Sequence, residues 1–230
     1  MADAVHRLSE VVCVVTVAED VEAERAALAD TLEVVGPNAP TGCGDWTAFD
    51  LAAHIVAADR AAGTLAFCIR ALATRGVQFN PKPPVIAAAI NRERRAGYPA
   101  LLARLRSRPP RLLLTPAVAA STLFEVWMHH DDLATTHGLV HQNPDHLAHA
   151  IPPLVRYHAR RLPTTGLIIR TTDGHQWTFG PDFGVPGAAV LSGPAADLIR
   201  WLSGRGPLAA LGVEAMPAVA EQLQAFVGTV

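Results

Sequence analysis

The sequence is poor in lysine, in cysteine and in long hydrophobic runs. Lys82 is its one lysine, and its three cysteines, Cys13, Cys43 and Cys68, are odd in number and lack C-x-x-C spacing. This pattern indicates neither a disulfide framework nor a zinc knuckle of thiolates, and it suits a reducing cytoplasm. No window reaches the roughly 18 uninterrupted apolar residues of a membrane span. We therefore expect a cytoplasmic protein without a membrane partner.

The sequence also lacks a large excess of charge of either sign. A net charge of −2 and a pI near 6.5 give no overall bias toward nucleic acid, so no nucleic-acid partner is expected. The local exception is the segment 92–111, where seven arginines face one acid, Glu93. This segment is interpreted either as a solvated helix face, the commoner case, or as a contact for an anionic ligand.

Helical spacing is typical of the first part of the chain. The expected helices cover residues 18–35, 47–72, 86–105 with an interruption near 97–99, and 116–136. Thr47 and Asp50 have the T-x-x-D form of a capping box, and Gly138 is a suitable C-cap. The proline-rich segment 78–85 is expected to be a loop. Apolar residues at steps of four and three after Asp50 favour bundle packing.

The last part of the chain has a mixed pattern. A helical region over 144–162, broken near 152–153, is followed by a predicted β-hairpin of 167–170 and 176–179, with 188–191 as a strand beside it. Two further helices are expected over 193–202 and 217–226. The fold class predicted is mainly α, with a four-helix bundle over 1–140 and a smaller α+β domain over 141–230.

Three polar residues mark the helix expected near the middle of the chain. Glu125, His129 and Asp132 stand at i, i+4 and i+7 among apolar neighbours, so they share one face of a mostly buried helix. An E-x-x-x-H pair on such a helix has the spacing of two metal ligands one turn apart. The alternative is that Glu125 and His129 simply bind each other as a structural pair.

A third metal ligand would have to come from elsewhere in the chain. His54 lies in the first two turns of the second helix, at the edge of its apolar stripe between Leu51 and Ala58. This position makes it the natural candidate. The alternative is a core histidine that is hydrogen-bonded to a carbonyl group.

Three motifs together resemble a known family. They are W-T-x-x-D-L-x-x-H at 46–54, E-V-W-M-H-H-D-D-L at 125–133 and G-P-A-A-D-L-I-R-W-L-S-G-R at 193–205. In this order, over most of the chain, they are similar to the mycothiol-dependent maleylpyruvate isomerases, whose N-terminal part is a DinB-like metal-binding four-helix bundle. The resemblance implies that His54, Glu125 and His129 hold a divalent metal, expected to be zinc. A position would then stay open for water or a thiolate, as in catalytic zinc sites.

The resemblance also implies roles for other residues. The metal would lower the pKa of the mycothiol thiol, and the thiolate would attack an electrophile. Asp132 is predicted to be a catalytic-site residue that orients a ligand imidazole, whereas His130, about 100° away on the helix, is not expected to be a ligand. Arg205 and Arg200 are predicted to bind the cofactor or a substrate carboxylate, with Arg205 also assigned to catalysis.

The function predicted is that of a metal-dependent, mycothiol-using enzyme, an isomerase or S-transferase, acting on a small electrophile. Two alternatives stay open. One is a non-catalytic regulatory module that binds a metal or ligand, for which the segment 92–111 is the supporting feature. The other is a metal-assisted hydrolase with Asp132 or Asp131 as base. The sequence does not identify the substrate, and it allows a monomer or a homodimer.

Overall fold

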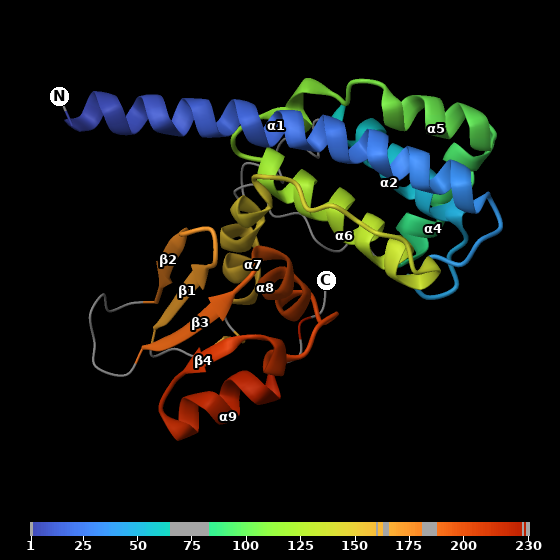
Figure 1. Ribbon diagram of the computed structural model, residues 1–230. Coiled ribbons are helices and arrows are strands. Elements are labelled where there is room, and N and C mark those ends of the chain that lie inside the picture. Colours follow the sequence, from blue (N-terminus) through green and yellow to red (C-terminus); the bar gives the residue numbers. More distant parts are fainter. Residues whose placement is uncertain are drawn as a thin grey trace. The chain divides into compact units, whose positions relative to one another are not determined.

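The computed structural model describes residues 2–64, 83–159, 161–162, 166–180, 188–226 and 228, with side chains from residue 17 onward. The chain divides into two compact units, Met1–His146 and Leu147–Val230. The first unit is helical, and the second contains a small sheet with helices (Figure 1). The prediction of a mainly α fold with a smaller α+β part is confirmed.

The first unit is a bundle. Its helices are α1 (Ala2–Val35), α2 (Ala48–Ala62), α4 (Pro83–Arg94), α5 (Tyr98–Arg106) and α6 (Ala119–His137), with a 3-10 turn, η1, at Arg111–Leu114. Helix α1 packs against α6 and α5, and α2 packs against α4 and α5 (Figure 1). The core between them is aliphatic, with fully buried residues that include Leu28, Leu32, Leu51, Ile55, Leu101 and Leu133.

Two predicted helix boundaries are confirmed. The Thr47 side chain accepts the Asp50 backbone N–H, and the Asp50 carboxylate accepts the Thr47 N–H at 3.0 Å, which completes the capping box of α2. At the end of α6, Gly138 has φ +63°, the left-handed conformation that favours glycine at a C-cap. These caps fix the ends of the helices that carry His54 and Glu125.

Three predicted boundaries are wrong. Helix α1 begins at Ala2, not near Ala18, because neither proline nor glycine interrupts the chain before Gly36. Helix α2 ends at Ala62 and is capped by Gly63, whereas residues 65–72, which were expected to extend it, lie outside the described part. Helix α4 begins at Pro83, inside the expected loop, since the first helical turn tolerates proline.

The second unit is built on a sheet with strand order β2-β1-β3-β4. Its strands are β1 (Leu167–Thr171), β2 (Gln176–Phe179), β3 (Ala189–Gly193) and β4 (Gly212–Glu214), and its helices are α7 (Ile151–His158), α8 (Ala195–Leu202) and α9 (Pro217–Ala225), with 3-10 turns η2 (Leu147–Ala150) and η3 (Leu208–Ala210). The β1–β2 hairpin is confirmed, and β3 lies parallel to β1. Strand β4, antiparallel to β3, was not predicted because three exposed residues carry no alternation signal.

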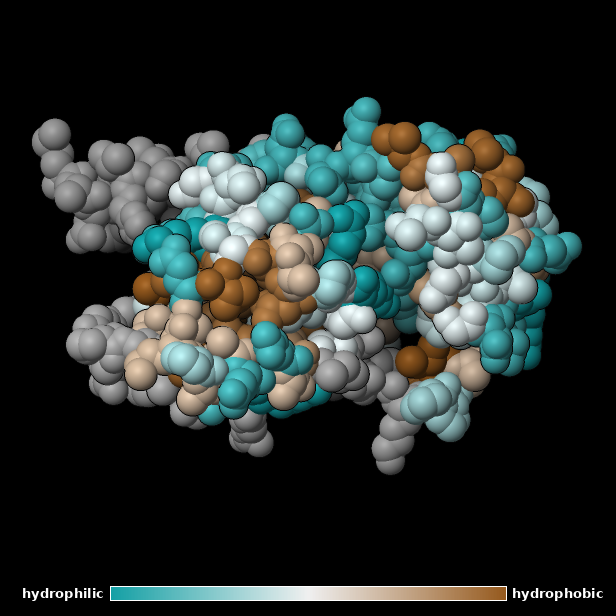
Figure 2. All heavy atoms as spheres, turned by 60° about the horizontal axis from the view of Figure 1, so that its bottom comes forward, coloured by the Kyte–Doolittle hydropathy of each residue, from teal (hydrophilic) through white to brown (hydrophobic). Residues whose placement is uncertain are grey.

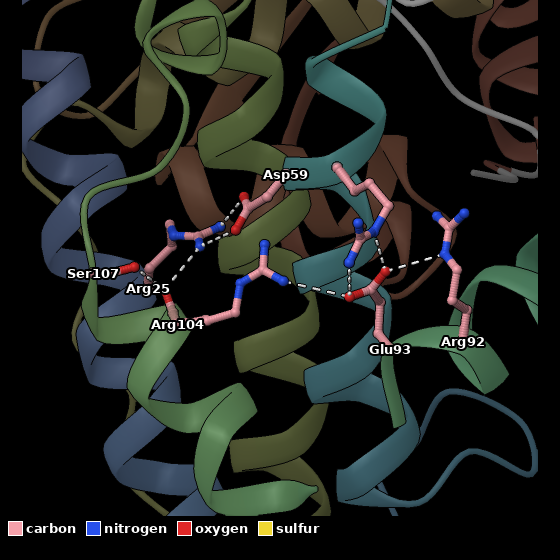
Figure 3. A network of polar contacts seen from close by, with 7 residues as sticks. Arg25, Asp59, Arg92, Glu93, Arg104 and Ser107 are labelled. Carbon is pink, nitrogen blue, oxygen red and sulfur yellow. Dashed lines mark hydrogen bonds and ion pairs between the residues drawn. The ribbon is translucent and has the colours of Figure 1, made fainter. Parts of the chain in front are cut away.

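A polar network crosses the interior of the bundle (Figure 3). Arg25 of α1 donates to both carboxylate oxygens of Asp59 of α2, at 3.1 and 2.9 Å, although both side chains are buried. Burial raises the pKa of Asp59, and the Arg25 charge opposes that rise. Glu93, also buried, accepts from Arg60, Arg92 and Arg104. The network therefore fixes how α1, α2, α4 and α5 face one another.

The arginine-rich segment 92–111 contributes ion pairs to the bundle. Several of its arginines form ion pairs with carboxylates of the same unit: Arg92 and Arg104 with Glu93, Arg94 with Asp50, Arg106 with Asp30 and Glu33, and Arg108 with Glu22. These arginines therefore stabilise the bundle by binding carboxylates within it.

The visible surface is mainly polar. In the space-filling view, hydrophilic and intermediate side chains cover much of the described face, and hydrophobic side chains gather in an area at the left and in smaller areas at the right (Figure 2). Among the described residues, no helix combines the length and apolar character that a membrane crossing requires.

Candidate metal centre

The three predicted ligands converge in the first unit. His54 comes from α2, and Glu125 and His129 come from α6. Nε2 of His54 lies 2.9 Å from Oε1 of Glu125, and Nε2 of His129 lies 3.6 Å from the same oxygen. One donor atom from each of the three residues lies within 4.8 Å of the others. We call these three residues the first triad.

The first triad is partly open to solvent. Glu125 is 31% exposed and His54 18%, while the His129 side chain is 7% exposed. The Glu125 carboxylate is thus less buried than the apolar sequence around it suggests. Burial acts to raise the pKa of Glu125, but hydrogen bonds and charge from His129 and His54 outweigh it and lower the pKa. The carboxylate is therefore ionised at neutral pH.

Trp46 covers the two imidazoles. Its ring centroid lies 4.7 Å from that of His54 and 6.1 Å from that of His129. The tryptophan thus forms one wall of the site. It is placed by the loop that runs from α1 to the N-cap of α2.

The same loop brings a cysteine to the site. Sγ of Cys43 lies 3.3 Å from Nδ1 of His129, and its thiol donates to Oδ2 of Asp132 at 3.3 Å. With its one proton directed to Asp132, the sulfur can accept a hydrogen bond from Nδ1–H of His129, and a metal bound at Nε2 would then replace the contact of that nitrogen with Glu125. The sequence analysis missed Cys43. The available signal was its position in the Thr-Gly-Cys-Gly loop that leads into the Trp46 motif.

A glycine allows the loop to approach α6. Gly42 has φ +77°, and a Cβ atom there would lie 2.6 Å from Oγ1 of Thr136 and 3.2 Å from the Asp132 carbonyl oxygen. Thr41, which is fully buried, donates to the Trp46 carbonyl at 2.9 Å and holds the turn around Cys43. The contact of Cys43 with His129 thus depends on a residue without a side chain at Gly42.

The remaining predicted residues lie in different places. Asp132 is beside His129, with Cys43 bound to both. His130 leaves α6 toward α1, where it contacts Thr31. Arg200 and Arg205 belong to the second unit: Arg200 pairs with Asp197 at 2.9 Å, and Arg205 donates to the Ser203 carbonyl at 3.0 Å. Their predicted roles toward a cofactor stay predictions.

The donor set of the first triad fits a divalent metal. Two imidazole nitrogens and one ionised carboxylate oxygen form the His₂Glu set of catalytic zinc sites, which leave a coordination position open. A partly exposed carboxylate agrees with an open position. The structure therefore provides residues suited to the metal that the motifs imply.

Comparisons with known proteins concern the family of the N-terminal part and the fold of the chain. Residues 21–134 match the family model described as the mycothiol maleylpyruvate isomerase N-terminal domain. A crystal structure of the mycothiol-dependent maleylpyruvate isomerase matches with a TM-score of 0.53 and 16% identity, covering 87% of this chain and 91% of that one. A histidine-to-alanine mutant of that enzyme matches with a TM-score of 0.52, at the same identity and coverage. No curated protein sequence matches the chain.

The match of the family model includes all three residues of the first triad, and the structural matches show that the fold extends over most of both units. The N-terminal part of this chain, residues 21–134, therefore belongs to the mycothiol maleylpyruvate isomerase N-terminal domain family.

Proposed function

We propose that the chain is a metal-dependent, mycothiol-using enzyme that acts on a small electrophilic substrate, either by maleylpyruvate-type cis-trans isomerisation or by thiol transfer. One observation carries the proposal. The first triad joins two helices in a His₂Glu donor set, partly exposed, inside the matched family domain. A bound zinc ion would supply a Lewis acid that lowers the pKa of a thiol.

The chain's own residues then have separate tasks. The ionised Glu125 carboxylate and the Nε2 atoms of His54 and His129 would hold the ion. Cys43 fixes the His129 ring, and its thiol proton is directed to Asp132. Asp132 thus acts as a positioning residue through Cys43. Trp46 shields one side of the imidazoles from water.

The second unit is proposed to supply positive charge. Arg205 and Arg200 would bind an anionic group of the cofactor or substrate, since guanidinium groups pair with carboxylates in a bidentate manner. Arg200 pairs with Asp197, and Arg205 donates to the Ser203 carbonyl oxygen. Replacing Arg205 by alanine should raise KM for the thiol or the substrate while the zinc content stays unchanged.

The test combines metal content with turnover. The full chain and its His54→Ala and Glu125→Ala variants are loaded with zinc and assayed with several electrophiles, with and without mycothiol. We expect thiol-dependent turnover in the parent and its loss in both variants, with folding checked by circular dichroism. A zinc-loaded parent without turnover and without mycothiol binding would contradict the enzyme proposal. Hydrolysis that needs no thiol would favour the metal-assisted hydrolase instead.

A further inference from the structure

A second cluster of metal-binding residues lies on the other side of α6. It consists of Glu24 from α1, His130 from α6 and His141 from the segment that follows α6, which we call the second triad. Oε1 of Glu24 lies 2.7 Å from Nδ1 of His130 and 2.8 Å from Nε2 of His141. The three side chains are only 4–6% exposed. This cluster is separate from the first triad, with which it shares no residue.

His141 lies between two carboxylates. Its Nδ1 faces Oδ1 of Asp131 at 3.4 Å, and its Nε2 faces Glu24. A neutral imidazole carries one N–H, so it can donate to one carboxylate only. A cation held at Nε2 would leave that N–H on Nδ1, where it donates to Asp131.

The Glu24 carboxylate is buried between the two imidazoles. Because buried charge is costly unless it is neutralised, a divalent ion bound by all three residues would offset the charge of this carboxylate.

The outer contacts of the imidazoles suit metal ligands. Asp131 accepts from Nδ1 of His141, and the Thr31 hydroxyl lies 2.8 Å from Nε2 of His130. In each ring, the nitrogen that does not face Glu24 therefore has a polar partner. Such outer partners orient the histidine ligands of metal sites. At tetrahedral bond lengths of about 2.0–2.1 Å, neighbouring donor atoms lie about 3.3 Å apart. The two contacts of Glu24 therefore have to lengthen by only about half an ångström.

The segment that carries His141 is held in place by further contacts. Trp127 of α6 stacks on the His141 ring at 5.8 Å and donates to Asn143 at 3.1 Å. Farther on, the His146 backbone N–H donates to Asp20 of α1 at 2.8 Å. The ligand segment is thus positioned against both helices without a metal.

We propose that Glu24, His130 and His141 form a second metal site for a divalent first-row ion such as zinc, with Asp131 and Thr31 orienting the imidazoles. Imidazole with one carboxylate suits zinc and its neighbours among these metals. Its ligands are almost fully buried, and the bound ion would join α1, α6 and the following segment.

The experiment measures zinc stoichiometry in the full chain. The parent and its variants are reconstituted with zinc, dialysed and analysed for metal, with folding checked by circular dichroism. We expect two zinc ions in the parent, one in His54→Ala, one in His141→Gln and none in the double variant. His146→Gln, which changes a histidine outside both triads, should keep two. Co²⁺ substituted into His54→Ala should give the visible absorption bands of the second site alone.

The outcomes separate this inference from the proposed function. One zinc in the parent, lost in His54→Ala but kept in His141→Gln, would overturn the second site and leave a protonated His141 in its place. Zinc lost in His141→Gln but unchanged in His54→Ala would support the second site and overturn the first. If His141→Gln does not fold, Glu24→Gln replaces it. Failure of zinc to raise the Tm of His54→Ala would also overturn the inference.

Discussion

At the scale of single residues, neighbouring histidines have different surroundings. His129 contacts Cys43 and Glu125, whereas His130 contacts Glu24 and Thr31. Each ring nitrogen thus has a defined partner, so the environment of each imidazole, not the histidine itself, decides what it can bind.

The role of Cys43 can be tested by substitution. Cys43→Ala removes the partner of Nδ1 of His129, so we expect zinc affinity at the first triad to fall by about 10- to 100-fold, as with other outer partners of metal-bound histidines. Cys43→Ser retains a hydrogen-bonding group and should lose less. Competition with a chromophoric chelator measures both. Equal affinities in the parent and Cys43→Ala would show that the contact does not orient the ring.

His158 gives the second unit a predictable pH dependence. The residue is fully buried, with ring contacts to Tyr157 and Phe226, and burial together with the Arg161 charge lowers its pKa to about 4. The ordinary pKa of a histidine side chain is 6.5. Between these values the unfolded chain binds more protons than the folded one, so stability rises with pH. The contribution of His158 to the free energy of unfolding is complete above pH 6.5 and is lost as the pH falls toward 4.

A His158→Leu variant isolates this effect. Since one pKa unit corresponds to about 1.4 kcal/mol, the parent should lose up to about 3 kcal/mol more unfolding free energy than the variant between pH 7 and pH 4. Urea unfolding at several pH values provides the comparison. A difference between the two proteins that stays constant with pH would contradict the prediction.

At the scale of elements, the loop between α1 and α2 depends on its glycines. Gly42→Ala would place a Cβ atom against Thr136 in a left-handed conformation, whereas Gly44, with φ +57°, has open space around it. We expect Gly44→Ala to cost about 1 kcal/mol for backbone strain alone, and Gly42→Ala about 2–3 kcal/mol. Denaturant unfolding measures both. Equal costs would mean that the contact between the loop and α6 relaxes freely.

Elements with local signals were predictable from the sequence. The T-x-x-D pattern located the start of α2, Gly138 the end of α6, and the Thr172-Asp173-Gly174 turn the β1–β2 hairpin, because each boundary depends on residues a few positions apart. The parallel pairing of β1 with β3 is different. It depends on contacts between distant segments, which no local pattern records.

The site was predictable to a similar extent. Helical spacing placed Glu125 and His129 on one face and His54 at the edge of an apolar stripe, and motif resemblance then implied that the three share a metal; the structure brings the three together. Cys43 and Glu24 carried no such periodic signal. Their approach to α6 depends on how the loop and α1 pack, which is a tertiary property.

At the scale of the whole molecule, metal binding should be linked to stability. A ligand that binds only the folded chain stabilises it by about 2.7 kcal/mol at one hundred times its Kd. For a chain of this size, that corresponds to a rise of about 5–10 °C in Tm for each site. Differential scanning calorimetry over a range of zinc concentrations should show this rise, smaller in His54→Ala. A Tm that is independent of zinc would exclude tight binding at either triad.

The adjacent positions of His129 and His130 on α6 have a mechanical consequence. Their side chains leave the helix about 100° apart, one toward the α2 side and the other toward α1. A helix held on one side can roll about its axis, whereas a helix held on two sides cannot roll without breaking both sets of contacts. If each triad binds an ion, a rotation of α6 that is favoured by one ion changes the affinity of the other triad for its ion. The same coupling acts in the reverse direction. The rotation of helix α6 about its own axis would then be set jointly by the two metal ions.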